Sequence, residues 1–144
     1  AIISGVGMDG EAQWSLETSH LQLAESSRVG AIGISGGLYY YFDQGIVAVS
    51  LADGAFVWRN TDVYAPSASV IGEDGTIYLC CRYDLDFAAV DKNGNTCKLI
   101  PQLAEDSLWP DQIALEQGRI KITETYNDQK VFYVDLESFA VTAS

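Results

Sequence analysis

The chain has 144 residues, of which 48% are hydrophobic and 19% charged, so it has the length and composition of one globular domain and not of a disordered segment. Twenty acidic against eight basic side chains give a formal net charge of −12, which argues against binding nucleic acid or an anionic membrane surface. The sequence contains no run of about 18 apolar residues and therefore predicts no membrane-spanning segment.

Residues 1–18 predict a hairpin, with a turn at Gly10 and Trp14 four positions later. The opening AIISGVGMDGE has no initiator Met, no basic region and no long apolar run, so it does not predict a signal peptide. The missing Met suggests a processed chain or a fragment of a longer one.

Residues 31–60 contain four short runs rich in β-branched and aromatic residues: AIGIS, LYYYF, IVAVSL and AFVWR. Turn signals separate them at Gly36-Gly37, at 43–45 and at Asp53-Gly54, because Gly accepts the positive φ of a tight hairpin turn. Strand-forming runs bounded by such turns predict a four-stranded antiparallel unit.

The same arrangement recurs in residues 67–100 and 111–142. The stretch 102–117 has an alternative interpretation as a helix, but Pro110 would interrupt any helix across it. We therefore expect a loop with at most one helical turn in its first half, followed by a strand in its second half.

The turns recur at a nearly constant interval. Gly10, Gly54 and Gly94 occupy corresponding turns and Phe139 stands where the next Gly would be, at intervals of 44, 40 and 45 residues. A period in the forties with four short strands per unit is typical of β-propeller blades, so we predict an all-β fold of four-stranded antiparallel blades. We expect a single propeller segment that contains the end of a preceding blade (1–18) and about three blades (31–60, 67–100 and 111–142).

A lone four-stranded sheet cannot bury its own faces, so the units must stack. The runs SASVI, IVAVSL and FAAV, which are first or third in their units, are almost wholly apolar, as expected of strands buried on both faces. Trp14 and Trp58 are expected to anchor the packing between sheets. Propellers close with about four to eight blades, so further blades would come from missing chain or from self-association. The alternative is an open stack of three sheets or another β-sandwich.

The segment AVSLADGAFVW (48–58) resembles the repeat of the PQQ-like, quinoprotein-type β-propeller family, which reads small-apolar-Asp, two residues, Thr-Gly, and Trp four after the Gly. Ser50 stands in the Asp place and Asp53 in the Thr place. The segment AAVDKNGN keeps Asp91 and its Gly, whereas YVDLESF keeps Asp135 and loses both Gly and Trp.

The resemblance covers nearly the whole chain and implies a β-propeller. The family mixes cofactor-dependent dehydrogenases with non-catalytic scaffolds, such as the lipoprotein of the outer-membrane assembly machinery. PQQ and calcium are candidate cofactors on this resemblance alone, and the family's catalytic Asp and calcium ligands match no residue here. Family members are commonly periplasmic or surface-exposed, so the resemblance implies a periplasmic or extracellular location.

Three features suggest chemistry. Some quinoprotein dehydrogenases carry a vicinal disulfide, but Cys80 and Cys81 would point to opposite faces of a strand, so we interpret them as buried thiols. The DKNGN segment (91–95) alternates oxygen-bearing residues like a calcium loop, yet its Gly and Glu spacing is wrong and a hairpin turn explains it. His20 is the only histidine, which argues against His-based metal or nucleophile sites.

In a propeller, the connections between second and third strands and those between blades emerge on one face. Here they carry aromatic rings beside carboxylates and amides, which suit basic side chains, peptide segments or sugar rings. The candidate partner-binding residues are Tyr64, Tyr83, Asp84, Asp86, Trp109, Tyr126, Asn127 and Asp128. The alternative is that these loops are merely polar and that Tyr64 and Trp109 fill the junction between blades.

No catalytic residue, cofactor-binding residue or metal ligand is predicted, because the sequence shows no metal cluster, no His-paired nucleophile and no phosphate-binding Gly loop. The leading hypothesis is a non-catalytic scaffold that presents loops to a protein or glycan partner. The alternatives are a fragment or subunit of a PQQ-dependent dehydrogenase and a carbohydrate- or cell-wall-binding module.

Overall fold

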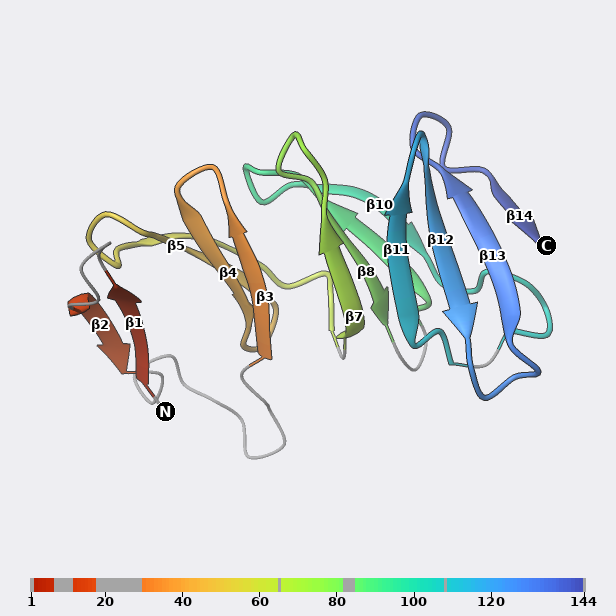
Figure 1. The fold of residues 1–144 in the computed structure, drawn as a ribbon, viewed down its shortest axis with the longest axis horizontal. Coiled ribbons are helices and arrows are strands. Elements are labelled where there is room, and N and C mark those ends of the chain that lie inside the picture. Colours follow the sequence, from red (N-terminus) through yellow and green to blue (C-terminus); the bar gives the residue numbers. More distant parts are fainter. Residues whose placement is uncertain are drawn as a thin grey trace. The chain divides into compact units, whose positions relative to one another are not determined.

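The computed structural model describes residues 2–6, 12–17, 30–64, 66–81, 85–107 and 109–143, and every regular element in them is a β-strand (Figure 1). The chain divides into two compact units, which we call the N-terminal unit (Ala1–Thr61) and the C-terminal unit (Asp62–Ser144). None of the described residues forms a helix that is long and apolar enough to cross a bilayer. The predictions for the turn at Gly10 and for His20, Tyr83 and Asp84 lie outside the described residues.

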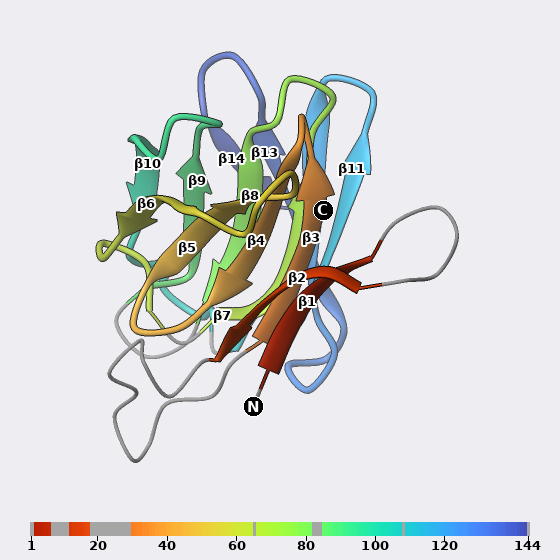
Figure 2. The ribbon, with the colours of Figure 1, turned by 90° about the vertical axis from the view of Figure 1, so that its left-hand side faces the viewer.

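The N-terminal unit holds an antiparallel hairpin and one four-stranded antiparallel sheet, in which strands adjacent in sequence are adjacent in space (Figure 2). The hairpin is formed by β1 (Ile2–Val6) and β2 (Ala12–Glu17). The sheet is formed by β3 (Gly30–Ser35), β4 (Leu38–Phe42), β5 (Ile46–Ser50) and β6 (Phe56–Asn60). Each strand of the sheet coincides with one of the apolar runs expected from the sequence.

The register of this sheet separates its aromatic residues onto two faces. Tyr40 pairs with Ala48, which in turn pairs with Trp58, so the rings of Tyr40 and Trp58 meet on one face with centroids 5.7 Å apart. The neighbouring Tyr39 and Tyr41 lie on the opposite face, with ring centroids 5.8 Å apart. Such aromatic contacts add stabilisation beyond the burial of their area.

The C-terminal unit contains two four-stranded antiparallel sheets with the same consecutive strand order. The first consists of β7 (Pro66–Ile71), β8 (Ile77–Cys81), β9 (Phe87–Val90) and β10 (Thr96–Ile100). The second consists of β11 (Gln112–Glu116), β12 (Arg119–Glu124), β13 (Lys130–Asp135) and β14 (Val141–Ala143). As expected, the stretch 102–117 is a loop followed by a strand, with no helix among its described residues.

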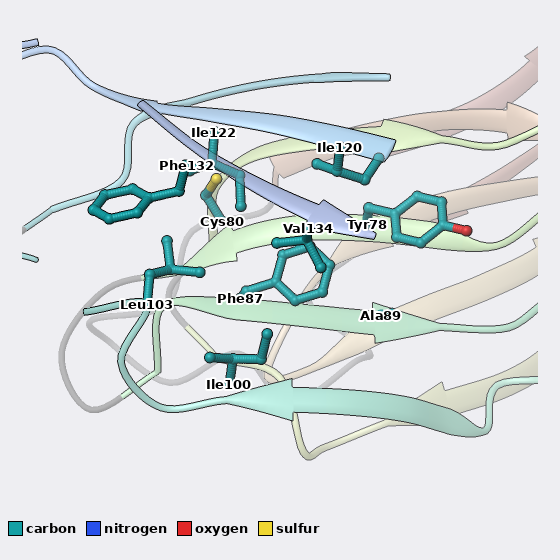
Figure 3. Packing of buried hydrophobic residues seen from close by; sticks show 10 residues of the cluster. All are labelled: Tyr78, Cys80, Phe87, Ala89, Ile100, Leu103, Ile120, Ile122, Phe132 and Val134. Carbon is teal, nitrogen blue, oxygen red and sulfur yellow. The ribbon is translucent and has the colours of Figure 1, made fainter. Parts of the chain in front are cut away.

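The two sheets of the C-terminal unit bury an apolar cluster between them (Figure 3). Strands β12 and β13 direct alternate residues into it, and the ring of Phe87 on β9 stacks on that of Tyr78 on β8 with centroids 6.4 Å apart. The cluster consists of Tyr78, Cys80, Phe87, Ala89, Ile100, Leu103, Ile120, Ile122, Phe132 and Val134. Because each residue is removed from water only when the sheets meet, this cluster holds the two sheets together.

The distribution of burial corrects one expectation. The third runs, in β5 and β9, are buried almost throughout, as expected. The run SASVI in β7 is only half-buried, whereas every residue of β8 is buried. The reason is position in the sheet: β7 is an edge strand and β8 is central, so β8 has a neighbouring strand on each side.

The repeated turns share one backbone conformation. Gly54 and Gly94 have positive φ values of 72° and 86°, and Phe139, which stands in the corresponding place, has a φ of 58°. A non-glycine residue there is strained, but the Phe139 side chain packs against the apolar cluster. The carboxylate of Asp135 also accepts the backbone N–H of Ser138, and this hydrogen bond lowers the pKa of Asp135. Packing and capping thus offset the missing glycine.

The turn between β7 and β8 predicts a pH dependence of stability. Asp74 Oδ1 accepts the backbone N–H of Thr76 at 3.0 Å, and this bond lowers the pKa of Asp74 below its ordinary 3.8. A carboxyl whose folded pKa is lowered stabilises the fold above its unfolded pKa, and that contribution disappears as the pH falls through the folded value. Asp74→Ala should therefore reduce the free energy of unfolding at pH 7 by less than about 1 kcal/mol, and the difference should shrink below pH 4.

Urea unfolding at pH 7 and pH 3 measures this difference, with Glu73→Ala at the exposed neighbouring position as the control. An equal loss of stability at both pH values would show that the Asp74 carboxylate does not act through its charged form.

Candidate functional site

Five of the predicted partner-binding residues, Tyr64, Trp109, Tyr126, Asn127 and Asp128, lie in connections at one end of the C-terminal unit, where β8 and β12 end and β7 and β11 begin, the lower end in Figure 1. Three aromatic side chains are exposed at this end: Tyr64 (41%), Trp109 (62%) and Tyr126 (83%). Tyr64 and Trp109 therefore do not fill a junction within this unit. We call this end, with its three exposed rings, the loop end.

Asp86, which the sequence also placed among the contact residues, lies beneath this surface. Its side chain is buried, and its Oδ2 accepts the backbone N–H of Leu103 at 2.8 Å and the hydroxyl of Ser107 at 2.7 Å. Its own backbone N–H donates to the carbonyl of Ile100. Hydrogen bonds to an ionised acceptor are about twice as strong as neutral ones. Asp86 thus fixes the first half of the 101–111 loop.

Glu124 fixes the second half of that loop. Its side chain, at the end of β12, is fully buried, and its Oε2 accepts the backbone N–H of Trp109 at 3.0 Å and the amide of Asn127 at 3.2 Å. The Glu124 carboxylate therefore holds both Trp109, whose indole is exposed, and the turn that contains Tyr126. Burying a polar group is costly unless it is hydrogen-bonded, and these bonds satisfy Oε2, one of the two carboxylate oxygens of Glu124.

Further contacts join the 101–111 loop to the turn between β12 and β13. The Asn127 amide donates to the carbonyl of Asp106 at 2.9 Å, and the Lys130 ammonium pairs with the Asp106 carboxylate. Asp111 Oδ1 accepts the backbone N–H of Thr125 at 2.8 Å. The loop and the turn are therefore one hydrogen-bonded layer, and the exposed rings stand on a pre-organised base.

Among the described residues, the exposed charge around these rings is mostly negative. Glu105 and Asp128 are exposed, and Asp128 lies in the turn next to Tyr126 with a φ of 56°. Lys130, the one lysine of this turn, is paired with Asp106. Aromatic rings beside carboxylates provide flat apolar contact together with attraction for cations. The loop end is thus suited to a partner that offers apolar and basic side chains.

Sequence reasoning missed Glu124, although a signal was present. Ile120, Ile122 and Glu124 share one phase of the alternation along β12, and the two isoleucines point into the apolar cluster. A carboxylate in an inward phase of a strand indicates a buried acid that requires hydrogen-bond donors.

Cys80 and Cys81 are buried within a strand. Cys80, Cys81 and Cys97 are free thiols, and the first two are buried. Cys80 belongs to the apolar cluster, as expected of a thiol on one face of β8, and its Sγ lies 3.7 Å from the carbonyl of Gln112. Burial raises the pKa of Cys81 to about 12 and that of Cys80 well above its ordinary value. A raised pKa favours the protonated thiol, which is the less nucleophilic form.

The described residues contain no cluster of metal-ligating side chains. Calcium takes about six to eight oxygen ligands, and no group of three or more His, Cys, Asp or Glu side chains within the described ranges could hold a metal ion. In the DKNGN segment, Asp91 Oδ1 accepts the backbone N–H groups of Asn93 and Asn95, both at 2.9 Å. This carboxylate caps a hairpin turn, which supports the turn interpretation of the segment.

The anchoring role of Glu124 is testable. Glu124→Ala leaves the N–H of Trp109 and the amide of Asn127 without this acceptor, so the free energy of unfolding should fall by about 2 kcal/mol. The Trp109 amide should also exchange its hydrogen faster, because the loop opens more often. Hydrogen exchange followed by NMR measures this effect, with Glu105→Ala in the same loop as the control. An unchanged Trp109 exchange rate would exclude Glu124 as the anchor.

Comparisons with known proteins place the fold. No family model matches the chain, and no curated protein sequence matches it significantly. The crystal structure of BamB from Moraxella catarrhalis matches 98% of this chain with a TM-score of 0.65 at 18% identity, over 41% of the BamB chain. A protein of unknown function from Bacteroides caccae matches 95% of this chain with a TM-score of 0.57 at 15% identity, over 51% of that protein.

The chain thus spans about half the length, or less, of the two proteins it matches. At such low identities the likeness shows the fold alone. BamB is a β-propeller, so the predicted all-β fold of four-stranded antiparallel propeller blades is confirmed.

Proposed function

We propose that the chain is a non-catalytic propeller scaffold that binds a protein partner through the loop end of its C-terminal unit. The observation that carries the proposal is the exposure of Trp109 and Tyr126 on a loop and turn that Glu124 ties together. Exposed aromatic residues on a rigid base lose little conformational entropy on binding, and they are the residue types that dominate protein interfaces. The likeness to BamB supports a scaffold role for this fold.

We also propose the finer assignments that the resemblance implies. The blades would be PQQ-like repeats, and the chain would act in the periplasm or outside the cell, since the structural neighbour is BamB. A glycan partner, the other class that suits aromatic loops, has no support from the comparisons.

The binding proposal is tested with a photo-crosslinking amino acid in place of Tyr126 of the intact chain, in its own cells. We expect discrete protein adducts, and Trp109→Ala should reduce their yield about tenfold, because a central aromatic contact contributes about 2 kcal/mol. The crosslinker at Phe56, an aromatic residue that is also exposed (60%) but lies in the N-terminal unit, is the control.

Adducts of the same identity and yield at Phe56 would contradict the proposal. Binding of the purified chain to a glycan array would also contradict the proposal if Trp109→Ala abolished that binding, because the loop end would then recognise a sugar.

A closed propeller also requires more blades than the three four-stranded sheets that the described residues form. We propose that self-association or further chain supplies them, because both matched structures are about twice as long or longer. Native mass spectrometry of the purified chain measures this. A multimer whose blades total four to eight is expected if self-association closes the ring, whereas a strictly monomeric chain would exclude self-association.

A further inference from the structure

A polar cluster on one face of the β3–β6 sheet belongs to neither the loop end nor the apolar cores. Tyr41 on β4 pairs with Val47 on β5, and Val47 pairs with Arg59 on β6, so Tyr41 and Arg59 lie on the same face, one strand apart. Asp43 lies two residues after Tyr41, in the same phase, at the start of the turn between β4 and β5. A phenol, a carboxylate and a guanidinium thus converge at the end of three adjacent strands.

The polar atoms of this cluster are buried and lack hydrogen bonds. The Tyr41 hydroxyl, both carboxylate oxygens of Asp43, and Nε and Nη2 of Arg59 have no hydrogen-bond partner. The closest approach, from Arg59 Nη2 to Asp43 Oδ2, is 3.6 Å, which is an ion pair but too long for a hydrogen bond. Native proteins rarely leave such groups unsatisfied, so a concentration of five atoms at one place indicates an occupant.

The chemistry of these atoms identifies the occupant. Nε and Nη2 only donate, the carboxylate oxygens only accept, and the hydroxyl does both, so the bridging group must accept and donate at once. Because the charges of Arg59 and Asp43 are opposite, the cluster has no net charge that would attract an ion. The Arg59 side chain is 29% exposed on the edge strand β6, whereas the Asp43 side chain is fully buried.

Asp43 in the β3–β6 sheet corresponds in register to Glu124 in the β11–β14 sheet, and the Glu124 carboxylate is hydrogen-bonded. Asp43 directly follows Phe42, which pairs with Ile46 at the start of β5, and Glu124 directly follows Thr123, which pairs with Val131 in β13. Glu124 accepts hydrogen bonds from the chain itself, at Trp109 and Asn127. Both are buried acids at the end of the second strand of a four-stranded sheet, but the Asp43 carboxylate has no such donor.

The titration of the two acids agrees with this environment. Burial raises the pKa of Asp43, and the neighbouring Arg59 lowers it in part. Burial, followed by the charge of Asp43, raises the pKa of Tyr41 to about 12.

We propose that ordered water is built into this cluster, accepting hydrogen bonds from Arg59 and donating to Asp43, with the Tyr41 hydroxyl as a further partner. Buried water typically makes about three hydrogen bonds to otherwise unsatisfied groups, and this cluster offers that number. The water would join the turn that begins at Asp43 to the end of β6. The two are already in close contact, since a Cβ on Gly45 would lie 2.4 Å from the carbonyl oxygen of Asn60.

A crystal structure of the intact chain, at a resolution that shows ordered water, tests the proposal directly. We expect a density peak within about 3 Å of both Arg59 Nη2 and Asp43 Oδ2. A direct hydrogen bond between the two side chains without such a peak, or another part of the protein bonded to the Asp43 carboxylate in its place, would overturn the proposal.

The sign of a stability change gives a second test in solution. If water satisfies the Tyr41 hydroxyl, Tyr41→Phe removes a hydrogen bond and should lower the urea midpoint of unfolding. If the hydroxyl is bare, the same change removes an unsatisfied buried group and should raise the midpoint. Tyr39→Phe, on the same face of the same strand, is the matched control and should leave the midpoint nearly unchanged. A midpoint that rises or stays the same in Tyr41→Phe would overturn the proposal.

Discussion

A four-stranded sheet has two faces and cannot cover either by itself, and the rest of this structure follows from that constraint. In the C-terminal unit two sheets turn one face each toward the other, and the apolar cluster between them contains residues of β8, β9, β12 and β13. Strand β12 shows the consequence: Ile120 and Ile122 are buried, whereas Arg119 on the opposite phase is exposed and lies 3.8 Å from the centre of the Tyr133 ring. Stacking, and not the strength of any single sheet, makes the fold stable.

Sheets that stack must still satisfy the polar groups at the ends of their strands. In this chain buried acids do so, because a carboxylate accepts several hydrogen bonds at once. Asp86 and Glu124 each hold one half of the 101–111 loop, so the loop is ordered without a helix or strand of its own. Asp43 occupies the position of Glu124 in the first sheet but faces Arg59 and Tyr41, which makes that turn dependent on solvent.

These two levels of organisation support the binding role proposed above. Several groups with unusual environments have structural roles: burial raises the pKa of the Cys80 and Cys81 thiols within packed strands, and the carboxylates of Asp86 and Glu124 anchor the 101–111 loop. The groups left at the surface of the loop end are rings with large contact area and little freedom. A stacked-sheet body that presents aromatic loops is a common solution for recognition, since binding residues are positioned by a rigid scaffold.

The amino-acid sequence by itself determined the number, type and limits of the strands, because turn residues and apolar runs act locally and recur at a fixed period. It also indicated which connections carry aromatic rings, including Trp109 and Tyr126. Only the tertiary structure decided that β8 is buried and β7 is not, and that Asp86 and Glu124 are supports beneath the surface. Burial and hydrogen-bond partners depend on which strand is central and which loop folds over it, and these are contacts between residues far apart in the chain.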